Sequence, residues 1–190
     1  MDDNPILLFA RHQDWKTWLD RNHSRSSGVW LRLAKKGSPI QSVSYAEAIE
    51  VALCYGWIDA LKRPESEHAW LQRFTPRKSR SIWSKINRQK ALALIEAGRM
   101  QPAGLQQVEQ AKKDGRWEGA YDSPASATVP DDLQAALNRN GRAKAFFSTL
   151  DKANRYAVLF RVQTAKRPET RAKRIQQFVE MLARREKLHP

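Results

Sequence analysis

The spacing of apolar and polar positions predicts strands and helices in the first part of the chain and helices in the rest. Apolar residues recur at helical spacing over residues 14–23 and lie on one face of a predicted strand over residues 29–35. Two further strands are predicted over residues 57–62 and 69–74. Because their connection is short and polar, we expect these two strands to be antiparallel neighbours.

Helix starts are marked by capping residues. Ser44 and Glu47 have the spacing of a capping box, which predicts a helix that ends near Gly56. Ser81 is predicted to cap another helix that runs through Ile95. The chain beyond this helix is predicted to be helical to its end, and its last helix has one apolar face formed by Ile175, Phe178, Val179 and Leu182. The fold class expected is therefore α+β, with a small antiparallel sheet and helices first and a mostly helical C-terminal part.

A polar stretch over residues 122–128 is the one plausible boundary in the chain. It predicts an α+β domain over residues 1–120 and a helical region over residues 121–190 packed on it, with a single domain as the alternative.

Composition removes several classes of protein. The 190 residues hold one cysteine, Cys54, which excludes a disulfide framework and a cysteine-based zinc site and favours a buried, inert thiol. No apolar run reaches the roughly 18 residues of a membrane helix, so no membrane insertion is expected. Two aspartates precede a short apolar run at the N-terminus, unlike a secretory signal, and this favours the cytoplasm.

The formal net charge of +14 is concentrated in two parts of the chain. Residues 51–100 hold 10 basic and 4 acidic residues, and residues 151–190 hold 11 and 4. We call Arg73–Lys90 the first basic block and Lys166–Arg174 the second basic block. Both are either solvated faces or sites for an anionic partner. The first block also contains aromatic residues among its cations, as base stacking or cation–π contacts require.

No catalytic or metal-binding constellation is evident. The four histidines are far apart and lack the spacing of metal ligands, and neither a glycine-rich phosphate loop nor a nucleophile motif occurs. Asp59 lies in an apolar strand and needs a partner, which Arg73 or Arg77 would supply. A structural ion pair is favoured over a catalytic acid at Asp59. We therefore expect neither a cofactor nor a metal, and the sequence favours a protein that is not an enzyme.

Several separated strings resemble one family in order. They are Ser44-Tyr45-x-Glu47-Ala48 running on to Ala52–Asp59, then Gln72–Arg77, Trp83-Ser84-Lys85-x-Asn87, Asn154–Tyr156 and Gln163–Arg171. Together they resemble the YdeI/OmpD-associated family, also called bacteriocin-protection proteins, from about Trp30 to Pro190. The resemblance implies a link to outer-membrane porin partners and to protection against bacteriocins or antimicrobial peptides. Some descriptions place the family in the periplasm. It implies no catalytic chemistry and no cofactor.

The candidate ligand-binding residues lie in the matching strings. They are Tyr55, Trp57, Asp59, Arg73, Thr75, Arg77, Trp83, Lys85 and Asn87. If the strands pair as expected and Trp83 and Asn87 share a helical face, these side chains form a pocket with aromatic walls and cationic donors. The alternative is a packing corner between sheet and helix. A second basic patch is predicted at Lys166, Arg167, Arg171, Lys173 and Arg174.

Three functions remain open at this point. The first is a non-enzymatic binding protein that holds an anionic ligand or an acidic protein surface. The second is a nucleic-acid-binding protein whose two basic blocks form one stripe. The third, ranked last, is an enzyme that uses Asp59 as acid or base. The sequence leaves the oligomeric state undetermined.

Overall fold

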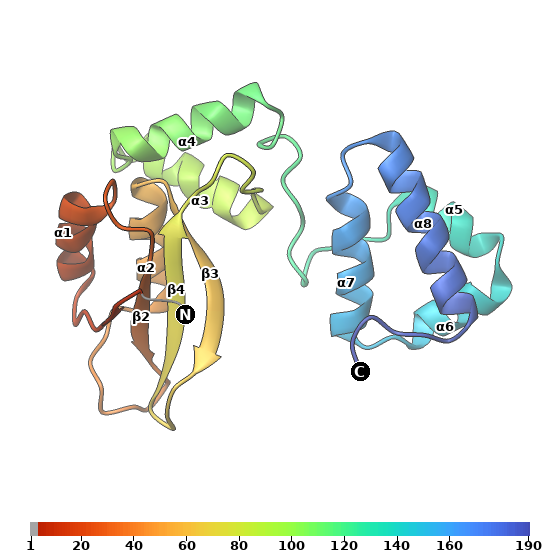
Figure 1. Ribbon diagram of the computed structural model, residues 1–190, viewed down its shortest axis with the longest axis horizontal. Helices are drawn as coiled ribbons and strands as arrows, with labels where there is room; N and C mark the ends of the chain where they lie inside the picture. Colours follow the sequence, from red (N-terminus) through yellow and green to blue (C-terminus); the bar gives the residue numbers. More distant parts are fainter. Residues whose placement is uncertain (1–3) are drawn as a thin grey trace. The chain divides into compact units, whose positions relative to one another are not determined.

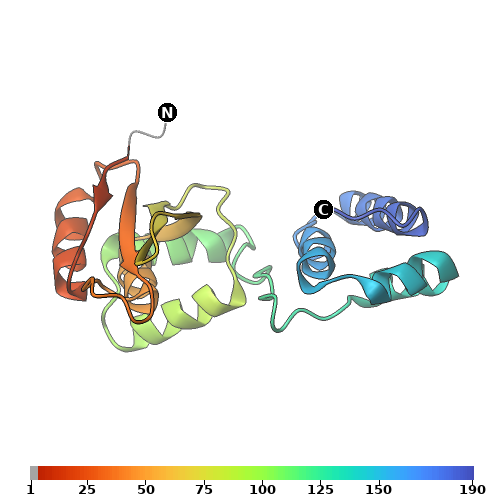
Figure 2. The ribbon, with the colours of Figure 1, turned by 90° about the horizontal axis from the view of Figure 1, so that it is seen from below.

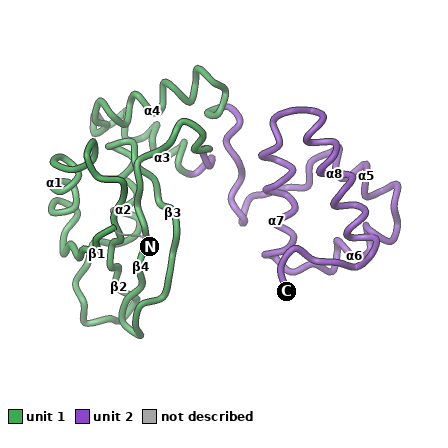
Figure 3. Tube along the Cα trace, viewed as in Figure 1, with its two compact units in different colours: residues 1–82, 87–117 green, residues 83–86, 118–190 purple. Residues whose placement is uncertain are grey.

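The computed structural model describes residues 4–190, which form two compact units (Figure 3). Unit 1 takes the residues up to Ile82 together with Asn87–Trp117, and unit 2 takes Trp83–Ile86 with Glu118–Pro190. The α+β fold class is confirmed, since the sheet lies in unit 1 and the later elements are helices (Figure 1). Whether the units are independent domains stays a prediction.

The sheet of unit 1 has the strand order β1-β2-β4-β3. The predicted strands are confirmed as β2 (Val29–Ala34), β3 (Trp57–Pro64) and β4 (Ala69–Pro76), and β3 and β4 pair antiparallel as expected. A two-residue strand that the pattern did not predict, β1 (Ile6–Leu7), adds a parallel pairing with β2 and makes the sheet mixed. The register shifts at a bulge between Asp59 and Lys62, which separates the two halves of β3.

Helices α1 (His12–Asn22) and α2 (Tyr45–Cys54) supply the core of unit 1. The capping box is confirmed: the Glu47 amide donates to Ser44 Oγ at 3.2 Å and the Ser44 amide donates to Glu47 Oε2 at 2.9 Å. The chain turns after α2 at Gly56, whose φ of +72° is disfavoured for other residues. Helices α3 (Lys85–Glu96) and α4 (Pro102–Lys113) lie at the end of the sheet away from the β3–β4 turn (Figure 1).

The predicted start of the helix after β4 is wrong. Ser81 does not cap a helix; its Oγ accepts a hydrogen bond from the Lys78 amide at 2.9 Å, within a turn. Residue Ser84 instead bridges Tyr121, whose amide donates to the Trp83 carbonyl at 3.0 Å, and α3 begins only at Lys85. Trp83 therefore precedes the helix and does not share a helical face with Asn87.

Unit 2 is built from α5 (Asp131–Asn138), α6 (Gly141–Thr149), α7 (Lys152–Gln163) and α8 (Pro168–Ala183). These four helices gather into one group in both views (Figure 1 and Figure 2), and α8 contacts α6. The predicted apolar face of α8 is confirmed, because Ile175, Phe178 and Leu182 are buried in the core of this unit.

Asn154 ties the C-terminal residues to α7. Its side chain is buried, and its Oδ1 accepts hydrogen bonds from the amides of Leu188 and His189 at 3.1 and 2.9 Å. Its Nδ2 donates to Asp151 Oδ2 at 2.9 Å and to the His189 carbonyl at 3.3 Å. A buried amide that uses both its oxygen and its nitrogen in this way is a structural group.

Candidate functional site

The two tryptophans of the predicted site are buried. Trp57 is 1% exposed, lies edge-on to Trp15 and Trp18, and donates from Nε1 to the His23 carbonyl at 3.1 Å. Trp83 is also 1% exposed. Neither ring presents a face to solvent, so both rings serve packing in this structure.

The polar residues beside Trp57 bond to neighbouring helices. Tyr55 is buried and its hydroxyl donates to Asp20 of α1. Burial and this bond raise the pKa of Tyr55, so the hydroxyl remains protonated at neutral pH. Asp59 is half-buried and accepts a hydrogen bond from the Tyr45 hydroxyl at 2.8 Å. The partner of Asp59 is thus a hydroxyl from α2, and not Arg73 or Arg77 as the sequence suggested.

The predicted residues at the end of β4 lie within or next to the strand. Arg73 and Thr75 are half-buried, opposite Trp30 and Ile58 in the sheet register. Arg77 is 5% exposed and donates from Nη1 to the Ile82 carbonyl at 3.2 Å. Residues 77–84 form a loop without a helix, so Arg77 does not lie at a helix start.

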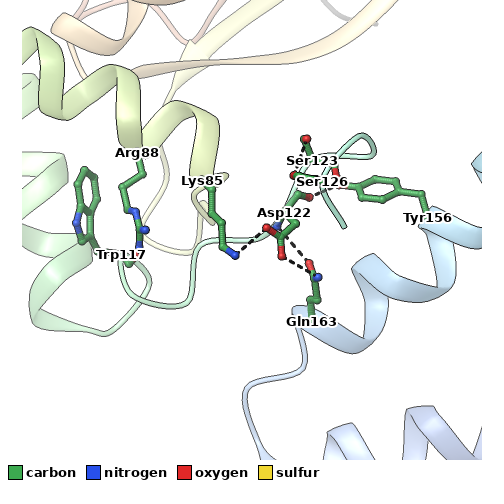
Figure 4. A network of polar contacts seen from close by, with 8 residues as sticks. All are labelled: Lys85, Arg88, Trp117, Asp122, Ser123, Ser126, Tyr156 and Gln163. Atoms are coloured by element: carbon green, nitrogen blue, oxygen red, sulfur yellow. Dashed lines mark hydrogen bonds and ion pairs between the residues drawn. The ribbon is translucent and has the colours of Figure 1, made fainter. Parts of the chain in front are cut away.

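Lys85 belongs to a polar network of unit 2 that Figure 4 shows. Its Nζ lies 2.7 Å from Asp122 Oδ1, and Asp122 Oδ2 accepts from Gln163 Nε2 at 3.0 Å. The Asp122 amide donates back to Gln163 Oε1 at 3.2 Å, and the Tyr156 hydroxyl donates to the Asp122 carbonyl at 3.0 Å. This network fixes the segment before α5 onto α7. The last candidate of the first set, Asn87, is half-buried.

Two arginines of the second basic block stabilise the helical unit. Arg171 binds Asp132 with Nε and Nη2, at 2.5 and 2.9 Å, and donates from Nη1 to the Val162 carbonyl at 2.8 Å. Arg174 donates to the Arg161 carbonyl at 2.5 Å. Both bonds reach carbonyls in the last turn of α7, where positive charge is favourable. Arg171 also holds the pKa of Asp132 below its usual range. The block's other cations, Lys166, Arg167 and Lys173, are exposed.

An exposed site that combines cations and an aromatic ring lies at the turn end of the sheet. This hairpin groove has a volume of about 610 Å³ and is lined by Ala34, Lys35, Lys36, Lys62, Arg63, Pro64 and Trp70. Its four cationic side chains are all exposed, and no carboxylate lines it. Lys62 Nζ lies 4.2 Å from the centre of the Trp70 ring. The sheet register explains the site, because it places Lys62 and Pro64 of β3 beside β4.

The electrostatic surroundings keep the groove positive. Glu65, which follows the groove residue Pro64 in the hairpin turn, is bound by Arg32 through Nε and Nη2 at 2.6–2.9 Å, and this bonding lowers the pKa of Glu65. Arg63 stacks over Trp30 at 4.3 Å and Lys35 donates to the Ser66 carbonyl at 2.8 Å. The charged groups of Lys35, Lys62 and Arg63 are therefore each positioned by a contact. Cations around a tryptophan face bind anionic groups that carry apolar neighbours.

The hairpin groove was not predicted from the sequence, although a site with cations and aromatic rings was. The two pairs, Lys35-Lys36 and Lys62-Arg63, are 27 residues apart in the sequence, and only the pairing of β2, β4 and β3 brings them together. A signal was present in the sequence: both pairs flank predicted turns, where charged side chains face solvent.

Residues 4–190 contain no cluster of three or more His, Cys, Asp or Glu side chains suited to a metal ion, and none of their helices is long and apolar enough to cross a bilayer.

Comparison with known families divides the chain in two. Residues 7–107 match the sequence model of a family described as domain of unknown function (DUF8412). Residues 126–185 match the model of the family described as bacteriocin-protection, YdeI or OmpD-associated. The second match confirms the suspected family, but the strings between Ser44 and Asn87 fall within the first match and outside the second. No curated protein and no solved structure matches the chain.

Proposed function

The chain belongs to the family of the domain of unknown function DUF8412 and carries a YdeI/OmpD-associated domain after it, and we propose that it is a non-enzymatic binding protein whose hairpin groove holds an acidic segment of a partner protein. The observation that carries the proposal is the groove itself: four exposed cations and Trp70 with no carboxylate in the lining.

An acidic protein segment fits the groove better than a small anion does. The cations come from both sides, Lys35 and Lys36 after β2 and Lys62 and Arg63 in β3, so the positive charge is spread along the groove. Pro64 and Trp70 add apolar surface between them. A peptide that alternates carboxylates with apolar side chains satisfies both features, and steering by the excess positive charge speeds its association.

The family description also names bacteriocin protection. A groove of this charge repels cationic antimicrobial peptides. A protective role of the groove would therefore depend on its binding to an acidic partner in the cell. We place this binding in the cytoplasm, as the sequence suggested.

The test uses the full chain and a fluorescein-labelled 12-residue peptide of alternating glutamate and phenylalanine, followed by fluorescence anisotropy. Lys62→Ala with Arg63→Ala is expected to weaken binding about tenfold, and Trp70→Ala by a similar factor. The matched control is Lys112→Ala with Lys113→Ala, which removes the same charge at the end of α4, outside the groove. Equal losses of peptide affinity in both double variants would mean that binding depends on net charge alone, and this would overturn the proposal.

Nucleic acid is the competing ligand, because a half-buried tryptophan among cations is also suited to base stacking. A labelled 12-residue oligothymidylate is titrated under the same conditions. The proposal expects it to bind more weakly than the peptide and to respond equally to both double variants. Tighter oligonucleotide binding that depends on Trp70 would replace the acidic partner with single-stranded nucleic acid.

A further inference from the structure

A second cationic cavity lies in unit 2, between α6 and the end of α8. This arginine groove has a volume of about 930 Å³ and is lined by Gly141, Arg142, Ala145, Phe146, Thr149, Ala183, Arg184 and Arg185. Three guanidinium groups line it and no carboxylate does. We propose that the arginine groove is a binding site for a phosphate monoester with an aromatic body. The proposal is independent of the hairpin groove, which lies in the other unit.

Arg185 has a backbone conformation that arginine rarely adopts. Its φ is +60°, and it is the one residue other than glycine with positive φ in the part of the chain that the structure describes. It stands directly after the last residues of α8, where the Glu186 amide bonds to the Met181 carbonyl at 3.1 Å and the Arg185 amide to the Leu182 carbonyl at 3.0 Å. Glycine is the usual residue at this position of the motif. An arginine here loses stability and is best explained by what its side chain does.

Arg142 is also placed against its local preference. It lies in the first turn of α6, which contains no acidic residue. The free amides at a helix N-terminus carry partial positive charge, so a cation there is unfavourable and an anion is favourable. The Asn140 side chain caps the Ala143 amide at 3.1 Å, but it brings no negative charge.

Arg142 and Arg185 both line the arginine groove. The free energy gained when an anion binds there offsets the unfavourable charge of Arg142 at the helix start and the backbone strain of Arg185. Within residues 4–190, neither the Arg142 nor the Arg185 guanidinium makes a hydrogen bond or an ion pair. Arg184 differs, because Glu186 binds it at 2.9 and 3.0 Å. Two guanidinium groups without partners match the two negative charges and three oxygens of a phosphate monoester.

The remaining lining suggests the organic part of the ligand. Phe146 is half-buried and faces the groove beside two small residues, Ala145 and Ala183. A phenylalanine ring with alanines beside it leaves room for an aromatic group to stack. The ester body therefore lies on Phe146, with its phosphate at the arginines.

The experiment measures binding of phenyl phosphate to the full chain by isothermal titration calorimetry, with inorganic phosphate and phenol as comparison probes. Phenyl phosphate is expected to bind at least tenfold more tightly than either. Arg142→Ala and Arg185→Gly are each expected to weaken it about tenfold, corresponding to 1.4 kcal/mol. The control is Arg167→Ala, which removes an exposed arginine at the other end of α8 and is expected to change the affinity less than twofold.

Arg185→Gly gives a second readout that separates binding from folding. Because glycine suits the left-handed conformation, this variant is expected to melt about 3 °C higher than the parent protein while it loses the ligand. Lower thermal stability with unchanged binding would assign Arg185 a structural role only. Failure of phenyl phosphate to bind at millimolar concentration, or an equal loss in Arg167→Ala, would overturn the proposal. Neither outcome bears on peptide binding at the hairpin groove.

Discussion

Cations at the turn end of unit 1 and cations at the α7–α8 corner of unit 2 are used differently. The exposed residues Lys62 and Arg63 place their charged groups over tryptophan rings, whereas Arg171 and Arg174 bond to helix carbonyls. Both regions come from sequence that is rich in Lys and Arg. Local charge density therefore does not identify a binding surface; the number of polar partners that the fold gives each cation does.

The same distinction between structural and binding side chains applies to tryptophans, and it is tested by the largest stability change that we expect. Trp57→Ala removes a fully buried ring from the cluster with Trp15 and Trp18, and is expected to cost about 4 kcal/mol of unfolding free energy. Trp70→Ala, in the hairpin groove, is expected to cost about 1 kcal/mol. Urea denaturation of both variants measures the difference. Equal costs would mean that Trp70 is a core residue and not a ligand platform.

Asn154→Ala is the next test, since the buried Asn154 side chain bonds the C-terminal residues to α7 in unit 2. The substitution leaves the amides of Leu188 and His189 without their acceptor, and is expected to cost about 2 kcal/mol. Hydrogen exchange is expected to quicken at these two amides first. If their exchange rates stay unchanged, Asn154 does not hold the C-terminal residues.

Asp132→Asn probes the ion pair of the second basic block through pH. Arg171 lowers the folded-state pKa of Asp132, so the carboxylate adds stability above its unfolded pKa of about 3.9, and this stability is lost as pH falls through the lower folded value. Because both side chains are partly solvated, about 0.5–1 kcal/mol is expected at pH 7. The gap between parent and variant is expected to close near pH 2. A constant gap down to that pH would exclude the carboxylate charge as its source.

The smallest effect is expected from Lys62→Ala. This change removes one exposed cation and its contact with Trp70, and is expected to alter the unfolding free energy by about 0.5 kcal/mol or less. Thermal melting of the variant, beside Arg171→Ala as the structural counterpart, measures this. A loss at Lys62 as large as that at Arg171 would remove the contrast between the two regions.

Local patterns predicted the elements of this fold well, because the capping box at Ser44 and the apolar face of α8 depend on neighbouring residues alone. Local patterns gave a wrong prediction where a contact between residues far apart in the sequence determines the structure. Ser81 has the right residue type for a helix cap, but the bridge from Ser84 to Tyr121 delays the helix.

The candidate site was harder to predict for the same reason. Trp57 and Trp70 stand in similar apolar strands, and only the positions of α1 and α2 determine that Trp57 is buried. The chemistry of a basic and aromatic surface was anticipated, but its members lie on strands that meet only after the sheet forms. The binding role of the predicted residues and the cytoplasmic location stay predictions.

The interleaving of the two units restricts where the gene can be divided. Trp83–Ile86 belong to unit 2 although unit 1 residues follow them, and they supply the Trp83 carbonyl and the Lys85 ammonium that bind Tyr121 and Asp122. An expression fragment that begins at residue 118 has neither group. A transplant of the helical unit into another protein therefore needs a substitute for this four-residue segment, and a swap of homologous C-terminal halves needs matching residues at 83–86.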